Sequence, residues 1–137
     1  MSGETDLAKL IATMEPELAN ERYIFATLEN WDYTLLAQLT PVSTFQEKEG
    51  LTVVLTQAKA DEFGIAYTGV FNCITLMVHS SLDAVGLTAA VSAKLTQVNV
   101  SANVIAAYYH DHVFINEHDG EKALMALQAL VQEGIAK

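Results

Sequence analysis

The chain has 137 residues, with 7 lysine and arginine residues against 17 aspartate and glutamate residues and a formal net charge of -10. This length is typical of one domain, or of two very small domains that share a core. Hydrophobic residues make up 51% of the chain and charged residues 18%, which excludes a disordered chain. Because so many residues are apolar, we expect part of the surface to be covered by another subunit.

The distribution of charge excludes two classes of partner. Arg22 is the single arginine, and the lysines are scattered along the chain, whereas binding to a phosphate backbone or to an anionic membrane needs clustered basic residues. No apolar run approaches the roughly 20 residues of a membrane-spanning helix. The single Cys73 cannot form an internal disulfide and is typical of a reducing compartment. We therefore expect a cytoplasmic protein with no nucleic-acid partner and no membrane partner.

The first half of the sequence predicts short helices and strands. Apolar residues at helical spacing predict a helix over residues 7–14, which Thr5 or Asp6 can cap. The acidic residues that follow Pro16 are interpreted as a link, and residues 30–39 fit a helix or a packed loop equally well. The other predicted elements are strands at residues 22–28, 42–47 and 51–57, the last two joined by a hairpin around Glu49–Gly50, and a short helix at residues 58–63 stopped by Gly64.

The second half predicts the order strand, helix, strand, strand, helix. A ferredoxin-like β-α-β-β-α-β fold needs one more strand, which must come from the N-terminal half or from another chain. Five aromatic residues at strand spacing are expected in the core or in an interface: Tyr23, Phe25, Tyr108, Tyr109 and Phe114. The predicted elements are a strand at residues 70–79, a helix at 86–98, strands at 103–109 and 112–116 around a turn at His110–Asp111, and a helix that Asp119–Gly120 begins and Gly134 ends.

Two segments of the second half carry a likeness to a known family. The run Ser81-Leu82-Asp83-Ala84-Val85-Gly86-Leu87 precedes a helix, and the segment from Val104 to Ile115 contains the run Tyr-Tyr-His-Asp-His-Val-Phe-Ile. Together they resemble an ACT domain. More narrowly, the chain resembles small bacterial ACT-like proteins whose second half is related to the arginine-sensing ACT proteins of animal nutrient signalling. The resemblance is good over residues 68–133 and weaker over residues 1–67.

The resemblance implies an α+β fold in which two ACT-like halves pack together. Residues 1–67 would form a degenerate N-terminal half and residues 68–137 the C-terminal ACT-like domain. It also implies a small-molecule ligand, usually an amino acid, that binds at an interface between domains and signals to a partner. A homodimer is the expected assembly, since two-fold contacts are the commonest way to cover an apolar surface.

The same resemblance assigns ligand-binding residues. Asp83, Val85, Gly86 and Leu87 match the ligand loop of the family, and Asp111 matches its hairpin aspartate. Free amides at the start of the helix suit a carboxylate, and an aspartate suits an ammonium or guanidinium group. The alternative is that the glycine only ends a loop and the aspartate only stabilises a turn.

Other chemistry has less support in the sequence. His110, Asp111, His112, His118 and Asp119 are residue types that bind zinc or nickel, but they also fit an exposed hairpin and helix cap, and we assign no metal. We find no nucleophile elbow, phosphate loop or dinucleotide motif, so we predict neither an enzyme nor a cofactor. Two functions remain open: a ligand-sensing regulatory module, and a structural or adaptor protein that uses the fold for protein association.

Overall fold

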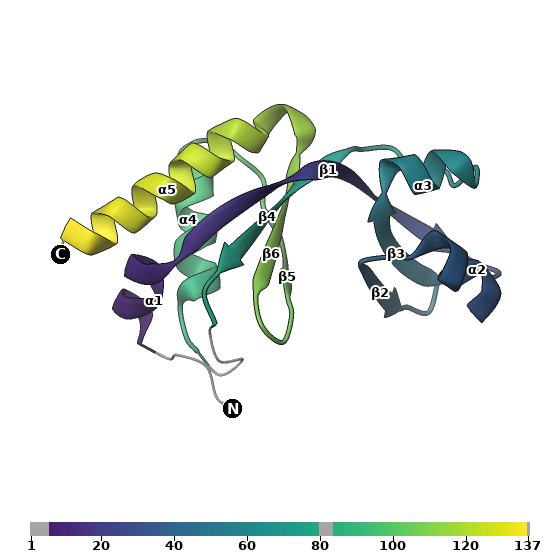
Figure 1. The fold of residues 1–137 in the computed structure, drawn as a ribbon, viewed down its shortest axis with the longest axis horizontal. Coiled ribbons are helices and arrows are strands. Elements are labelled where there is room, and N and C mark those ends of the chain that lie inside the picture. Colours follow the sequence, from purple (N-terminus) through teal and green to yellow (C-terminus); the bar gives the residue numbers. More distant parts are fainter. Residues whose placement is uncertain (1–5, 80–83, 137) are drawn as a thin grey trace. The chain divides into compact units, whose positions relative to one another are not determined.

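A computed structural model describes residues 6–79 and 84–136 (Figure 1). The chain forms two compact units. Unit 1 is built from the residues up to Ala19 and from Asn72 onward, and unit 2 is built from Asn20–Phe71. The strand order is β2-β3-β1-β4-β6-β5, and the long strand β1 (Glu15–Leu28) contributes residues to both units. No helix among the described residues is long and apolar enough to cross a membrane.

Unit 1 packs three helices against alternate residues of its strands. The apolar core contains Ile74 and Leu76 of β4 and Val113 and Ile115 of β6, together with Leu127 of α5, because residues two apart in a strand face the same side. The antiparallel β5–β6 register pairs Ala106 with Asp111. The elements are α1 (Leu7–Thr13), β4 (Phe71–Met77), α4 (Leu87–Gln97), β5 (Asn103–Ala106), β6 (Asp111–Asn116), the 3-10 turn η1 (Glu117–Asp119) and α5 (Gly120–Ala136).

Unit 2 is built in the same way around a smaller core. Strands β1 and β3 are antiparallel, with Ile24 opposite Leu55 and Leu28 opposite Leu51, and these four side chains are buried. The predicted hairpin is confirmed by the pairing of β2 with β3. Residues 33–39 form a helix, which decides between the helix and the packed loop that the sequence left open for this segment. The remaining elements are α2 (Tyr33–Leu39), β2 (Ser43–Gln46), β3 (Leu51–Thr56) and α3 (Gln57–Glu62).

The strand that the ferredoxin-like order lacked comes from the N-terminal half. β1 begins at Glu15, so the prediction of a link after Pro16 is wrong, and β1 lies beside β4 in the sheet. Leu18 packs against the core of unit 1. A proline and two glutamates hide this strand from local pattern analysis, because its pairing with a distant strand decides its structure.

Two predicted boundaries in unit 1 are also wrong. Tyr108 and Tyr109 do not continue β5: they form the turn, in which the Ala107 amide donates to the His110 carbonyl at 3.1 Å. Both tyrosines are exposed, by 61% and 62%, rather than buried in a core. Gly134 does not end α5, which continues to Ala136. A Cβ at Gly134 would lie 2.9 Å from Ile11 Cγ2, so this glycine allows α5 to approach α1 closely.

Candidate functional site

The start of α4 is the first part of the predicted site. Gly86 is the N-cap residue, with φ +101 and ψ -14, and no side chain of the described residues makes a capping hydrogen bond there. Asp6, Asp32 and Thr56 each accept a backbone hydrogen bond at the start of α1, α2 and α3. The first amides of a helix lack partners within the helix, so the amides at the start of α4 are oriented to receive an acceptor such as a carboxylate.

The two residues next to Gly86 in the chain differ in the exposure of their side chains. Val85 is 82% exposed, whereas Leu87 is 4% exposed and belongs to the core of unit 1. Leu87 can therefore offer a ligand its backbone amide but not its side chain. A Cβ on Gly86 would lie 2.9 Å from Leu7 Cδ2, so α1 packs closely against this loop. Asp83, the first predicted ligand residue, lies outside the described residues.

The β5–β6 turn lies at the end of β4 that leads toward α4 (Figure 1). The ring of His79, which follows β4, contacts the ring of Tyr109 with 5.5 Å between centroids, and Tyr109 contacts Tyr108 edge-on at 4.9 Å. His110 Nδ1 lies 3.4 Å from the Val78 carbonyl oxygen. The turn thus presents an exposed aromatic surface, which sequence analysis missed because tyrosine is typical of strands.

Asp111 lies beside this turn and not within it. It is the first residue of β6 and is half-buried. Burial raises the pKa of the Asp111 carboxyl, and the nearby charges of His112 and His110 act in the opposite direction. The charged neighbours of Asp111 are thus the histidines on either side of it in the chain, whereas Gly86 lies close to Leu7.

His112 and Cys73 lie on one face of unit 1 around Thr75. His112 Nδ1 and Thr75 Oγ1 are 2.9 Å apart. Burial lowers the pKa of His112, as does the charge of His110, while Asp111 raises it. Burial raises the pKa of the Cys73 thiol to about 11, although a hydrogen bond with Thr75 acts to lower this pKa. The thiol is therefore neutral at physiological pH and a weak nucleophile. No group of three metal-ligating side chains occurs among residues 6–79 and 84–136.

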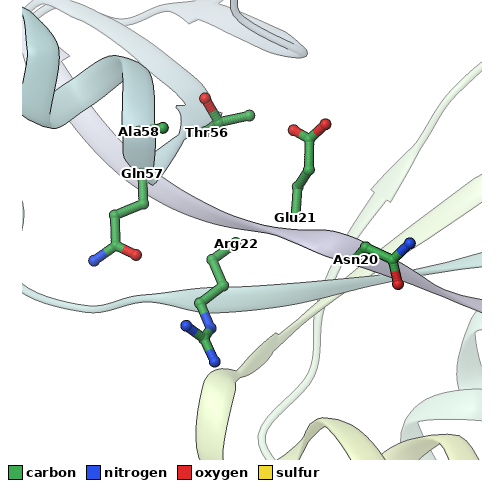
Figure 2. Close-up of a pocket in the computed structure, with 6 residues that line it drawn as sticks. All are labelled: Asn20, Glu21, Arg22, Thr56, Gln57 and Ala58. Atoms are coloured by element: carbon green, nitrogen blue, oxygen red, sulfur yellow. The ribbon is translucent and has the colours of Figure 1, made fainter.

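Sequence analysis also missed a polar pocket in unit 2 (Figure 2). It has a volume of about 560 Å³ and is lined by Asn20, Glu21, Arg22, Thr56, Gln57 and Ala58. The available signal was Arg22, the chain's single arginine. Its 35-residue separation from Gln57 hid the pairing that brings the two segments together.

Comparison with family models identifies the chain. One model of the ACT domain matches residues 2–72, and a second ACT-domain model matches residues 70–129. The chain belongs to the ACT-domain family. ACT domains are generally small-molecule-binding regulatory modules, and the expected ferredoxin-like α+β fold with two ACT-like domains is confirmed.

Solved structures contain several similar proteins. A Vibrio cholerae protein of unknown function, described as a possible transport protein, is 44% identical, with a TM-score of 0.82 over 91% of this chain and 95% of that one. A protein from Agrobacterium tumefaciens is 17% identical, with a TM-score of 0.71 over 86% and 89%. The regulatory subunit of aspartate kinase from Thermus thermophilus is 11% identical, with a TM-score of 0.65 over 88% and 97%. No match is found among the curated proteins.

Proposed function

We propose that this ACT protein is a regulatory sensor that binds an amino acid at the start of α4. The observation that carries the proposal is the geometry of Gly86, which begins α4 with a positive φ and, among the described residues, without a side-chain cap. The amides of Gly86, Leu87 and Thr88 would receive the ligand carboxylate. Glycine at this position lets a ligand approach the backbone, because it has no side chain.

Asp111 would hold the cationic end of the ligand. A carboxylate accepts charge-assisted hydrogen bonds from an ammonium or guanidinium group, and the net charge of -10 favours cationic ligands near the protein. Asp83 and Val85 complete the proposed ligand-binding set. The rest of the site would come from a second copy of the chain, which is why we propose a homodimer.

Regulation then requires only a difference in ligand affinity between two states of the protein. The protein would have no catalytic activity of its own and would act in the cytoplasm by passing the binding event to a partner. In support, the similar Thermus thermophilus protein is a regulatory subunit. The division of the chain into residues 1–67 and 68–137 remains part of the proposal.

A thermal-shift screen with the twenty amino acids tests the proposal. A ligand at a hundred times its dissociation constant adds about 2.7 kcal/mol to the free energy of unfolding, which raises the melting temperature measurably. Asp111→Ala is expected to abolish the shift, whereas Glu121→Ala, which removes an exposed acid from α5, is expected to retain it. If no amino acid shifts the melting temperature, the sensor proposal fails.

A structural or adaptor function is the second candidate. Phe45 of β2 is 71% exposed and Val42, which directly precedes β2, is 56% exposed, and β2 is an outer strand of the sheet order. Exposed apolar side chains on an edge strand favour pairing with another chain. Light scattering at increasing protein concentration tests this: association that Phe45→Ser weakens supports the adaptor, and a monomer at every concentration contradicts it.

A further inference from the structure

Among the described residues, strand β5 has a single neighbour in the sheet, which is β6. Its other side is an outer edge, and its four residues are half-buried or exposed. The edge of a sheet presents N–H and C=O groups that the ladder leaves unpaired. Such groups can pair with a further strand, so the orientation of each residue of β5 decides what this edge offers.

The register of the hairpin determines which groups of β5 face outward. The Ala107 amide donates to the His110 carbonyl, so these two residues form a hydrogen-bonded pair. Opposed pairs in an antiparallel ladder alternate between bonded and non-bonded. Ala106, the next residue along β5, and Val104 therefore lie at non-bonded pairs, and their N–H and C=O groups point away from β6. No turn or loop among the described residues makes a backbone hydrogen bond to either residue.

The sequence around β5 lacks the features that normally protect an edge strand. Charged side chains, proline and bulges prevent unwanted pairing at natural edges. Strand β2, at the other end of the strand order, is flanked by Pro41 and by the charged turn Glu47–Glu49. By contrast, no lysine, arginine, aspartate or glutamate occurs from Leu95 to His110. Of the two edges, β5 is thus the less protected.

An aromatic surface adjoins one end of this edge. Tyr108 and Tyr109 follow β5, are exposed, and contact each other edge-on with 4.9 Å between ring centroids. The faces of tyrosine rings attract the cations of arginine and lysine. The net charge of -10 also attracts a basic partner to this edge, whereas a second copy would bring the same negative charge. Charge therefore favours a basic partner here.

We infer that β5 is the docking strand for an extended, basic segment of another protein, which adds a strand to the sheet. Hydrogen bonds to the main chain of Val104 and Ala106 supply affinity, and alternate apolar side chains of the segment cover Val104 and Ile105. An arginine or lysine beyond the paired residues lies on Tyr108 or Tyr109. This inference goes beyond the proposed function, which names no surface for its partner, and it does not require an amino acid at α4.

Amide hydrogen exchange, followed by nuclear magnetic resonance, tests the edge with a defined probe. The probe is the peptide acetyl-Arg-Val-Thr-Val-Thr-Arg-amide, and its control has glutamate in place of both arginines. In the protein alone, the Ile105 amide is expected to exchange slowly because it bonds to β6, and the Val104 and Ala106 amides rapidly. At about nine-tenths saturation, the arginine peptide is expected to slow exchange at Val104 and Ala106 about tenfold. The glutamate peptide at the same concentration is expected to leave it unchanged.

Proline substitutions distinguish the two edges of the sheet. Ala106→Pro removes an outward N–H without removing a bond to β6, and is expected to weaken the arginine peptide about fivefold, measured at the Val104 amide. Gln46→Pro is the matched control, because Gln46 holds the same place beside the bonded pair Glu47–Gly50 of the other hairpin. It is expected to bind the peptide as the unmodified protein does. Circular dichroism in urea checks that both variants fold.

Two further substitutions test the charge and the aromatic contact. Ala106→Lys places a positive charge on the exposed edge, so it is expected to weaken the arginine peptide even if the proline variant does not fold. Tyr109→Ala is expected to weaken the same peptide about threefold. Tyr33→Ala removes an exposed tyrosine from unit 2 and is expected to have no effect on binding.

The proposal is overturned if the arginine peptide protects neither outward amide, or if both peptides protect them equally. It is overturned equally if folded Ala106→Pro and Ala106→Lys bind the arginine peptide with unchanged affinity. Protection of Val104 and Ala106 in the protein alone that rises with protein concentration would assign this edge to a second copy instead. None of these measurements uses an amino acid, so the docking strand and the sensor site at α4 can fail separately.

Discussion

Replacing Gly86 by alanine tests how the start of α4 is built. At φ +101 and ψ -14 Gly86 is in the left-handed region, which an alanine rarely adopts. That conformation costs about 1–2 kcal/mol for a residue with a Cβ. The new Cβ would also lie 2.9 Å from Leu7 Cδ2. Leu7 must then leave its rotamer, at about 0.5–1.5 kcal/mol. We expect the free energy of unfolding to fall by about 2–3 kcal/mol.

Gly64→Ala is the matched control. Gly64 also has a positive φ, of +65, but a Cβ there meets nothing within 4 Å. It is expected to cost about 1 kcal/mol, so the difference between the two variants measures the Leu7 contact. A double-mutant cycle with Leu7→Ala isolates the same contact, because it removes the side chain that the alanine would meet.

Denaturation by urea, followed by circular dichroism, supplies the free energies. The predicted cost of the backbone conformation at Gly86 is refuted if Gly86→Ala unfolds at the same urea concentration as the unmodified protein. The predicted cost of the Leu7 contact is refuted if Gly86→Ala and Gly64→Ala lose equal stability and the double-mutant cycle with Leu7→Ala shows no coupling. The first result would mean that the loop before α4 adapts to a side chain without cost, and the second that Leu7 moves aside without cost.

Three further predictions concern the core and the buried groups of unit 1. Leu127→Ala, at a fully buried position on α5, is expected to lose about 2–5 kcal/mol of unfolding free energy, while Gln128→Ala on the exposed face changes it little; urea denaturation measures both. The Cys73 thiol, with a pKa of about 11, is expected to resist a thiol reagent at mildly alkaline pH until the protein is unfolded, and rapid labelling of the folded protein would contradict this. Because the pKa of His112 lies below its usual 6.5, the folded state binds fewer protons there than the unfolded chain. Its contribution to stability is therefore complete above pH 6.5 and is lost as the pH falls below that value. Urea denaturation at a series of pH values should show this loss, and His112→Gln should reduce it.

The sequence predicted those elements whose apolar pattern is local. The helices α4 and α5 repeat apolar residues at helical spacing, and their buried faces follow this repeat. The hairpin of β2 and β3 is predicted by the glycine in its turn, Gly50. In both cases neighbouring residues carry the information that decides the structure.

Elements decided by distant contacts could not be predicted in this way. The first residues of β1 are a strand because they pair with β4, more than fifty residues later in the chain. Tyr108 and Tyr109 have high strand propensity, yet the pairing of Ala106 with Asp111 leaves them in the turn. A glycine such as Gly134 is typical of a helix end. Only its closeness to Ile11 in the structure shows that it instead allows α5 to approach α1.

The start of α4 and the pocket of unit 2 differ in what the sequence could reveal about them. Gly86 stands next to the helix whose amides it exposes, so its loop was a candidate from the sequence alone. Arg22 acquires meaning only when β1 pairs with β3 and brings Gln57 beside it. A carboxylate ligand suits the amides at the start of α4, and Asp111 is the proposed contact for its cationic end. An amino acid whose thermal shift survives Asp111→Ala would therefore remove Asp111 from the proposed site.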